Sequence, residues 1–411
     1  TAGSVRGKRL HGSLVAAQIA LTLLLLTAAG AAIQGFVRLT RVPLGYDPHH
    51  VLSVGIPLQE NAYTTWQARV NYFEQLRASV ATLPDVTSTA VTGNGMLPYG
   101  GFELRFDLLG KPAASPEAQT ARVEFVGPAY FSTLHIPLLE GRIWNSAEVS
   151  HGALLVLVNQ SFVRRYLPGG DVIGHSVKLS KLSNHPPRTF TAPGADGWLQ
   201  VIGVVGDALN NGLEKPVEPA IFSPYSLQLW MGTEILVRTR VAPEAIAQSI
   251  RRQVAAVNPD QQTDSKIEDL ETEIRQEPVW ARGRLISALF AGFSILALVL
   301  SAVGLYSVSS YAVAQRTNEF GIRMALGAGR AHVFRIVMAS AAVSVGIGIA
   351  AGLALSLGLN RFISGWVGST TSHPMIAMGV SLLLLMVAAM ACLAPARRAL
   401  AVDPMTALRR E

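Results

Sequence analysis

Four stretches of the chain contain no Lys, Arg, Asp or Glu and are far longer than the apolar segments of an ordinary soluble domain. Each holds between 25 and 35 uncharged residues, and they cover residues 10–37, 285–315, 336–360 and 362–396. About 20 apolar residues in a helix cross a bilayer core about 30 Å thick. Buried helices of a soluble protein would instead show a polar stripe. The pattern predicts four transmembrane helices, at residues 14–37, 285–313, 337–359 and 374–394.

The first run has a second interpretation as a cleaved signal peptide. Arg6, Lys8 and Arg9 form a basic start, and the small residues 28–32 resemble a cleavage region. A signal core, however, has only about 7 to 15 apolar residues, which favours a membrane anchor here. The chain begins at Thr1 rather than Met, which is typical of an excerpt or a processed product.

Residues 38–284 read as ordinary globular sequence with strand and helix signals. A helix capped by Thr64 or Thr65 is predicted to run to about Leu83, and a second helix covers residues 243–257. Strands are predicted at residues 51–56, 86–91, 102–109, 121–126, 153–158, 198–205 and 234–239. We therefore expect an α+β extracytoplasmic domain, inserted between the first transmembrane helix and a three-helix transmembrane bundle.

Two segments of this domain are predicted to lie outside its core of strands and helices. Residues 181–197 are rich in Pro, Ser, Asn and Gly and indicate an exposed loop or a join between subdomains. Residues 267–284 are charged and mostly helix-forming, so we expect a stalk that continues into the second transmembrane helix.

The charge distribution orients the membrane helices. The chain carries 34 basic and 27 acidic residues, and its pI is near 9.7. The flanks 1–13, 314–336 and 395–411 all have a basic excess, whereas residues 38–284 have a slight acidic excess. Because basic loops stay in the cytoplasm, we expect residues 38–284 and 360–373 outside. The net charge of +7 thus reflects topology and predicts no nucleic-acid partner.

Motifs of catalysis and metal binding are absent from the sequence. It has no phosphate-binding Gly-x-x-x-x-Gly-Lys-Ser/Thr loop, no Gly-x-Ser-x-Gly turn and no His-Glu-x-x-His pair. His49 and His50 are neighbours that would point apart on a strand, and Asp207 is interpreted as a turn residue. A single cysteine, Cys392, excludes a disulfide within the chain and is expected to pack in the apolar interior. We expect no metal, no directly bound cofactor and no enzyme.

The loop between the second and third helices combines a charged edge with an apolar ridge. On a helix, Arg316, Glu319 and Arg323 share one edge, and Phe320 and Met324 form the adjacent ridge. Glu319 precedes Arg323 by four residues, the favourable order for an ion pair. Such a helix suits docking into a groove of a soluble partner. The alternative is a charged loop that only stops translocation, and the residues alone do not decide between them.

The third span carries small residues at every fourth position. These are Ser344, Gly348, Gly352 and Ser356, and they form a seam that lets another helix approach closely. The partner helix could belong to a second copy or to the same chain. In the first span, Gln18 and Gln34 are interpreted as helix contacts rather than cargo ligands.

Residues 304–328 resemble the signature of FtsX-like permeases of the MacB type of ABC transporter. The C-terminal segment 402–408 is similar to the same family, and segments 124–142, 158–166 and 202–207 are similar to the MacB-like periplasmic core domain. Finer detail resembles one module of the duplicated permeases of Acidobacteria. Asn318 and Phe320 depart from the usual basic and aliphatic residues of the family, which leaves the identity of the docking partner open.

The resemblance implies a permease subunit that does not itself hydrolyse ATP. It implies an ABC-type ATPase in the cytoplasm that uses ATP and receives the helix around residues 316–326, and a second permease module that is fused or homodimeric. An extracytoplasmic adaptor or cargo would complete the assembly in the bacterial inner membrane. The alternatives are an FtsX-like module that regulates a cell-wall hydrolase, a membrane-anchored scaffold without an ATPase and, disfavoured by the motif search, a membrane enzyme.

Overall fold

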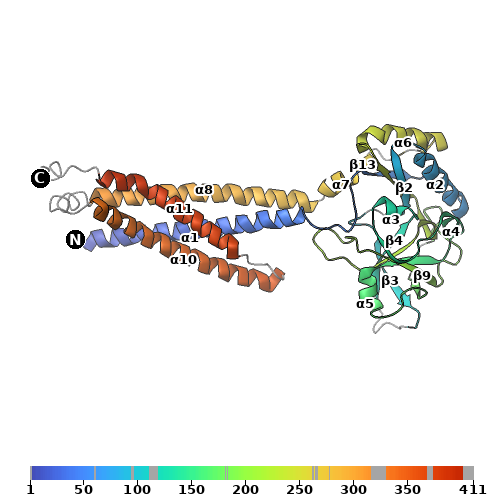
Figure 1. The fold of residues 1–411 in the computed structure, drawn as a ribbon, viewed down its shortest axis with the longest axis horizontal. Coiled ribbons are helices and arrows are strands. Elements are labelled where there is room, and N and C mark those ends of the chain that lie inside the picture. The colour runs from blue at the N-terminus through green and yellow to red at the C-terminus, as the bar shows by residue number, and fades with distance from the viewer. Residues whose placement is uncertain are drawn as a thin grey trace. The chain divides into compact units, whose positions relative to one another are not determined.

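A computed structural model gives the fold of residues 2–59, 62–93, 97–110, 119–180, 182, 184–261, 263, 267–276, 278–315, 330–367 and 374–400. The chain divides into two compact units (Figure 1). The membrane unit comprises residues 1–40 and 280–411, and the outer unit comprises residues 41–279.

Four long helices form the membrane unit: α1 (Ala2–Leu39), α8 (Pro278–Gln315), α10 (Arg330–Val367) and α11 (Pro374–Leu400). All four are long and apolar enough to cross a membrane, as the uncharged runs predicted. In Figure 1 the start of α1, the end of α8, the start of α10 and the end of α11 lie at the same end of the unit. This arrangement agrees with the prediction that the three basic flanks lie on one side of the membrane.

The interior of the membrane unit is made of aliphatic side chains from all four helices. Val15, Ile19 and Leu23 of α1 pack with Leu305 of α8, and α10 and α11 contribute Ala341, Val345, Leu384 and Cys392. Cys392 is 1% exposed, which confirms the expectation that it packs in the interior. Large exposed side chains such as Leu289, Phe293 and Met378 cover the outside, as expected where the solvent is lipid.

One half of the outer unit is an antiparallel sheet with the order β2-β12-β1-β13. Its strands are β1 (Val51–Pro57), β2 (Val86–Thr92), β12 (Gly232–Thr239) and β13 (Ile267–Asp269), and its helices are α2 (Trp66–Ala81) and α6 (Pro243–Val257). Along the chain they follow the order β-α-β-β-α-β, which is the ferredoxin-like arrangement. The second half of the outer unit is inserted between β2 and β12.

The inserted half is built on a closed ring of six strands. Each strand of the ring pairs with the next in the order β3-β4-β10-β6-β9-β7, and β7 pairs with β3 to close it. The strands are β3 (Phe102–Leu108), β4 (Thr120–Val126), β6 (Leu155–Asn159), β7 (Ser176–Leu179), β9 (Leu199–Val205) and β10 (Ala220–Pro224). The neighbouring elements are β5 (Leu138–Gly141), β8 (Thr189–Thr191), β11 (Gln228–Trp230), η1 (Tyr225–Leu227), α3 (Tyr130–Thr133), α4 (Ser146–Ser150) and α5 (Gln160–Tyr166).

Local sequence explains why α2 forms where it does. Thr65 caps the helix, because its side chain accepts a hydrogen bond from the backbone N–H of Ala68 at 3.2 Å. Val70, Phe73 and Leu76 recur at helical spacing and are fully buried. Each of the seven predicted strands also coincides with a strand of the structure to within two residues.

Two expectations need correction. Residues 181–197 are not simply a loop, because β8 lies inside them and pairs with β11 to form a two-stranded sheet. Residues 267–284 do not begin as a helical stalk, because residues 267–269 form β13 and extend the sheet beside β1. The helix α7 (Leu270–Gln276) follows β13 inside the outer unit. Residues 278–284 are helical and continue into the second predicted span, because they form the start of α8.

Candidate functional site

The predicted docking loop lies outside the described residues. Arg316, Glu319, Phe320, Arg323 and Met324 all fall between the end of α8 at Gln315 and the start of α10 at Arg330. Both flanking helix ends lie at one end of the membrane unit (Figure 1). The docking role of these five residues therefore stays a prediction.

The small-residue seam of α10 faces α1 of the same chain. A Cβ atom built on Gly348 would lie 2.8 Å from the carbonyl oxygen of Ala16, and one on Gly352 would lie 3.0 Å from that of Ala20. Both glycines are buried, whereas Ser344 and Ser356 at the ends of the seam are half-buried. Of the two partners that the sequence left open, the structure places a helix of the same chain against the seam.

Polar side chains line the contact between α8 and its neighbours. The hydroxyl groups of Thr22 and Ser301 share a hydrogen bond of 2.7 Å, and the Ser294 hydroxyl donates to the Leu25 carbonyl at 3.0 Å. Gly304 leaves room for Gln18, whose Oε1 would lie 2.6 Å from a Cβ added there. Within the bilayer, such pairs satisfy groups that would otherwise lack a partner. Gln18 thus makes a helix contact, as interpreted from the sequence.

A charged network in the outer unit anchors the segment that follows α1. Arg238 of β12 donates to the Asp47 carboxylate at 3.1 Å and to the Asp47 carbonyl at 2.7 Å. His135 lies 3.1 Å from the same carboxylate. Burial alone would raise the pKa of Asp47, but the His49 backbone N–H and the Arg238 guanidinium outweigh it and lower this pKa below its ordinary value.

The same segment is tied to α7, the helix that precedes α8 in the chain. The Nδ1 atom of His49 lies 2.7 Å from the Glu271 carboxylate, which also accepts a hydrogen bond from Arg275 at 2.5 Å. Burial tends to raise the pKa of Glu271, but Arg275 and His49 outweigh it and lower the value. The two connections of the outer unit to the membrane helices are therefore joined by the contact between His49 and Glu271.

The histidine pair and Asp207 make contacts with other residues of the outer unit. His49 contacts Glu271, whereas His50 lies 3.2 Å from the Val241 carbonyl, and no group of three metal-ligating side chains occurs among the described residues. Asp207 accepts hydrogen bonds from the backbone and hydroxyl of Ser161 and pairs with Arg164. It thereby stabilises the first turn of α5, a structural role.

Two buried ionisable side chains were not identified from the sequence. Glu124 of β4 is 1% exposed and accepts a hydrogen bond from the Tyr130 hydroxyl at 3.0 Å, and burial raises its pKa to about 7. Arg69 of α2 is fully buried; it donates to the Pro187 carbonyl at 2.8 Å and lies over the Phe190 ring. Burial lowers the pKa of Arg69 to about 10.

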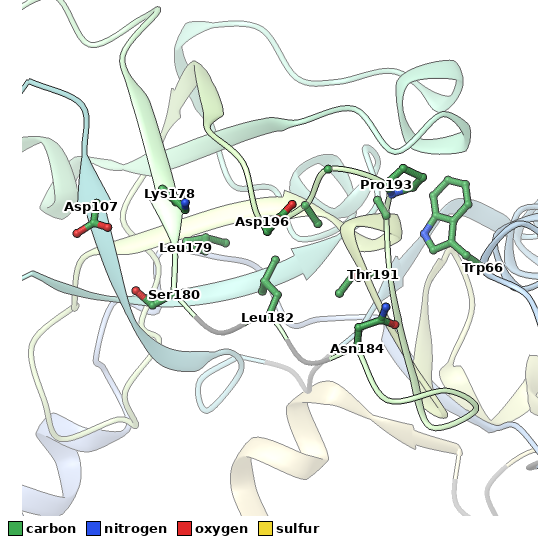
Figure 2. Close-up of a pocket in the computed structure, with 13 residues that line it drawn as sticks. Trp66, Asp107, Lys178, Leu179, Ser180, Leu182, Asn184, Thr191, Pro193 and Asp196 are labelled. Atoms are coloured by element: carbon green, nitrogen blue, oxygen red, sulfur yellow. The ribbon is translucent and has the colours of Figure 1, made fainter.

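The outer unit also contains an open groove with a cavity volume of about 670 Å³. Figure 2 shows Asp107 and Lys178 at one end, Asp196 and Leu182 near the middle, and Trp66 beside Pro193 at the other end. The residues come from β3, β7, the segment around β8 and the start of α2. This groove, the ionic contacts at the two connections and the helix seam are the candidate functional features of the described residues.

Comparison with protein families identifies two matches that together cover most of the chain. Residues 14–256 match the MacB-like periplasmic core domain, and residues 291–404 match the FtsX-like permease C-terminal domain. The first match alone covers more than half of the 411 residues.

Individual relatives carry the same family names. The chain is 26% identical over 312 residues to a macrolide export ATP-binding/permease protein MacB of Chromobacterium violaceum, which covers 71% of this chain and 44% of that protein. It is 24% identical over 236 residues to the MacB protein of Neisseria gonorrhoeae, with 54% and 33% covered. The solved periplasmic region of MacB from Actinobacillus actinomycetemcomitans aligns at 13% identity and a TM-score of 0.37, over 56% of this chain and 92% of that one. The chain thus spans less than half the length of these curated relatives.

Proposed function

Because the chain belongs to the MacB/FtsX family of ABC transporter permeases, we propose that it couples ATP hydrolysis by a separate ATPase to movement of its outer domain, for efflux or extraction of cargo. It is a multi-pass protein of the bacterial inner membrane with a large domain on the periplasmic side. ATP would be bound by the partner, and the 411 residues contain no phosphate-binding loop of their own.

The observation that carries this proposal is the way in which the chain enters and leaves the outer domain. His49, in the segment after α1, contacts Glu271 of α7, the helix before α8. Arg238 of β12 binds Asp47 and so holds the segment after α1 on the sheet. A displacement of either α1 or α8 would therefore be delivered to the same part of the outer domain. A rigid sheet moved by two linked connections suits the transmission of force.

The membrane unit supports the same mechanism. The four predicted spans contain no Asp, Glu, Lys or Arg, so they offer no charged pathway for a solute. The close approach of α10 to α1 at Gly348 and Gly352 makes these helices a packed pair that would move together. These features favour transmission of motion over conduction through a pore.

The partners follow from this proposal. An ATPase of the ABC type would bind the loop between α8 and α10 from the cytoplasm, and a second permease module, fused or separate, would complete the symmetric assembly that closure of two ATPases requires. A periplasmic adaptor or the cargo itself would contact the outer domain.

The proposal is tested at the predicted docking loop. We expect the single variants Glu319→Arg and Arg323→Glu to weaken co-purification of the ATPase while membrane insertion stays intact. Arg335→Glu is the control, because it reverses a charge beyond the predicted docking segment and should leave co-purification unchanged. The combined exchange Glu319→Arg with Arg323→Glu restores the ion pair within the loop. If this double variant recovers binding, the pair only stabilises the loop, and if both single variants bind normally, the docking proposal is wrong.

A further inference from the structure

The groove of the outer domain is lined by five polar side chains. They are Asp107, Lys178, Ser180, Asn184 and Asp196. None of these five side chains makes a hydrogen bond or an ion pair with another residue that the structure describes. Some carboxylates elsewhere in the outer domain are paired: Glu148 binds Arg142 through both oxygens, and Asp47 binds Arg238. The groove thus keeps donors and acceptors available on one concave surface.

Fixed elements hold the groove in shape. Asp107 of β3 lies directly opposite Lys178 of β7 in the register of the two strands. The Trp66 indole donates from Nε1 to the Ser226 carbonyl at 2.7 Å. The wall formed by residues 192–197 is a tight turn with backbone hydrogen bonds of 3.1 Å and 2.8 Å. The backbone around the groove is therefore held in place, whereas the exposed side chains of Asp107, Lys178 and Asp196 would become ordered on binding.

The chemistry of the lining selects the class of ligand. A phosphate or other anion would meet two carboxylates, and a purely apolar molecule would bury polar groups without partners. A neutral polyhydroxylated molecule satisfies both kinds of group, because its hydroxyls donate to Asp107 and Asp196 and accept from Lys178 and Asn184. Its C–H faces can pack on Trp66.

We propose that this groove binds a short neutral oligosaccharide segment on the periplasmic side of the membrane. Its volume of about 670 Å³ falls within the roughly 300–1,000 Å³ of sites that enclose drug-sized ligands, which is room for several sugar rings. Glycan binding of this kind is independent of ATPase docking, because the groove lies in the outer domain and the docking loop on the cytoplasmic side.

The test uses the full chain in lipid nanodiscs, because many detergents carry sugar head groups that would compete. Binding of tetra-N-acetylchitotetraose and of maltotetraose, both neutral, is measured by isothermal titration calorimetry. We expect saturable binding of at least one of them. Asp107→Asn and Asp196→Asn each remove a charge-assisted hydrogen bond, so each should weaken binding by about tenfold. The matched control is Asp171→Asn, an exposed carboxylate outside the groove, and it should bind as the unchanged protein does.

Three outcomes would overturn the proposal: no saturable binding of either sugar, an equal loss of binding in the Asp171→Asn control, or binding of a tetraglycine peptide in place of the sugars. Thermal unfolding of each variant shows that it is folded, so lost binding cannot be attributed to misfolding. The same preparations are assayed for co-purified ATPase. A groove variant that loses sugar but keeps the ATPase separates this proposal from that of ATPase coupling.

Discussion

The seam between α10 and α1 gives the sharpest prediction of stability. Replacing Gly348 by Ala places a methyl group 2.8 Å from the Ala16 carbonyl oxygen and 2.8 Å from the Ile19 Cβ atom. At Gly352 the corresponding contacts, with Ala20 and Leu23, are both 3.0 Å. Such distances are shorter than van der Waals contact, and the backbone of α1 cannot rotate away as a side chain would. Overpacking of this kind costs about 1–3 kcal/mol per site.

The same helix provides matched controls. A Cβ atom added at Gly346 or Gly358 meets nothing within 4 Å. Alanine at these positions relieves the conformational entropy of glycine, worth about 0.5–1 kcal/mol, so Gly346→Ala and Gly358→Ala should be neutral or stabilising. The sign of the change in stability therefore distinguishes the seam variants, at Gly348 and Gly352, from the control variants, at Gly346 and Gly358.

Thermal unfolding in nanodiscs is the assay. A change of 1 kcal/mol shifts the midpoint by about 2–4 °C for a domain of 150–250 residues, so the double variant Gly348→Ala/Gly352→Ala should unfold several degrees below the control pair. Cross-linking between two copies of the chain is measured in parallel. If all four single variants shift the midpoint equally, or if the seam variants reduce only dimer cross-links without changing the midpoint, the packing of α10 on α1 within one chain is refuted.

Two further predictions concern the outer domain and the membrane topology. Burial raises the pKa of Glu124 from its ordinary value near 4.5 to about 7, so its protonated form stabilises the fold fully below about pH 4.5, and this stabilisation is lost as the pH rises to about 7. Glu124→Gln should flatten the dependence of the unfolding midpoint between pH 5 and 8, and an unchanged slope would contradict the assignment. For the topology, single cysteines replace Ser183 or Gly329 in a Cys392→Ser background. An impermeant thiol reagent should label position 183 in intact spheroplasts and position 329 only after permeabilisation, and equal labelling of both would contradict the orientation.

The membrane architecture could be predicted from sequence because its signal is local and strong. A run of 25 or more residues without a charge has few folded environments other than a bilayer, and Arg and Lys at its ends orient it. The longer strands of the outer domain were predictable for a similar reason, since alternation over six or seven residues is a clear pattern.

The parts that could not be predicted depend on contacts between distant residues. The closed ring needs β7 and β10, which have only four and five residues, and its closure depends on pairing of β10 with β4 about a hundred positions away. Arg69 lies four positions before Phe73 on the buried face of α2, where the pattern alone would place an apolar side chain. Its partners are the Pro187 carbonyl and the Phe190 ring, which no local rule connects to it.

The groove was missed because its residues are scattered in the chain. The sequence separations between successive members of the set Trp66, Asp107, Lys178 and Asp196 are 41, 71 and 18 positions, and these residues form no motif. The docking loop is the opposite case: its pattern was evident from sequence, and its role stays a prediction because it lies outside the described residues.

In the proposed mechanism, ATP hydrolysis in the cytoplasm moves the outer domain. Spin labels on cysteines replacing Asp171 in the outer domain and Gly358 in α10, again in a Cys392→Ser background, report the distance between the two units in the complex with the co-purified ATPase. We expect the distance distribution to differ between the ATP-bound and nucleotide-free complexes, and Glu319→Arg to abolish this difference. An identical distribution in both states while ATP is being hydrolysed would contradict the proposed mechanism.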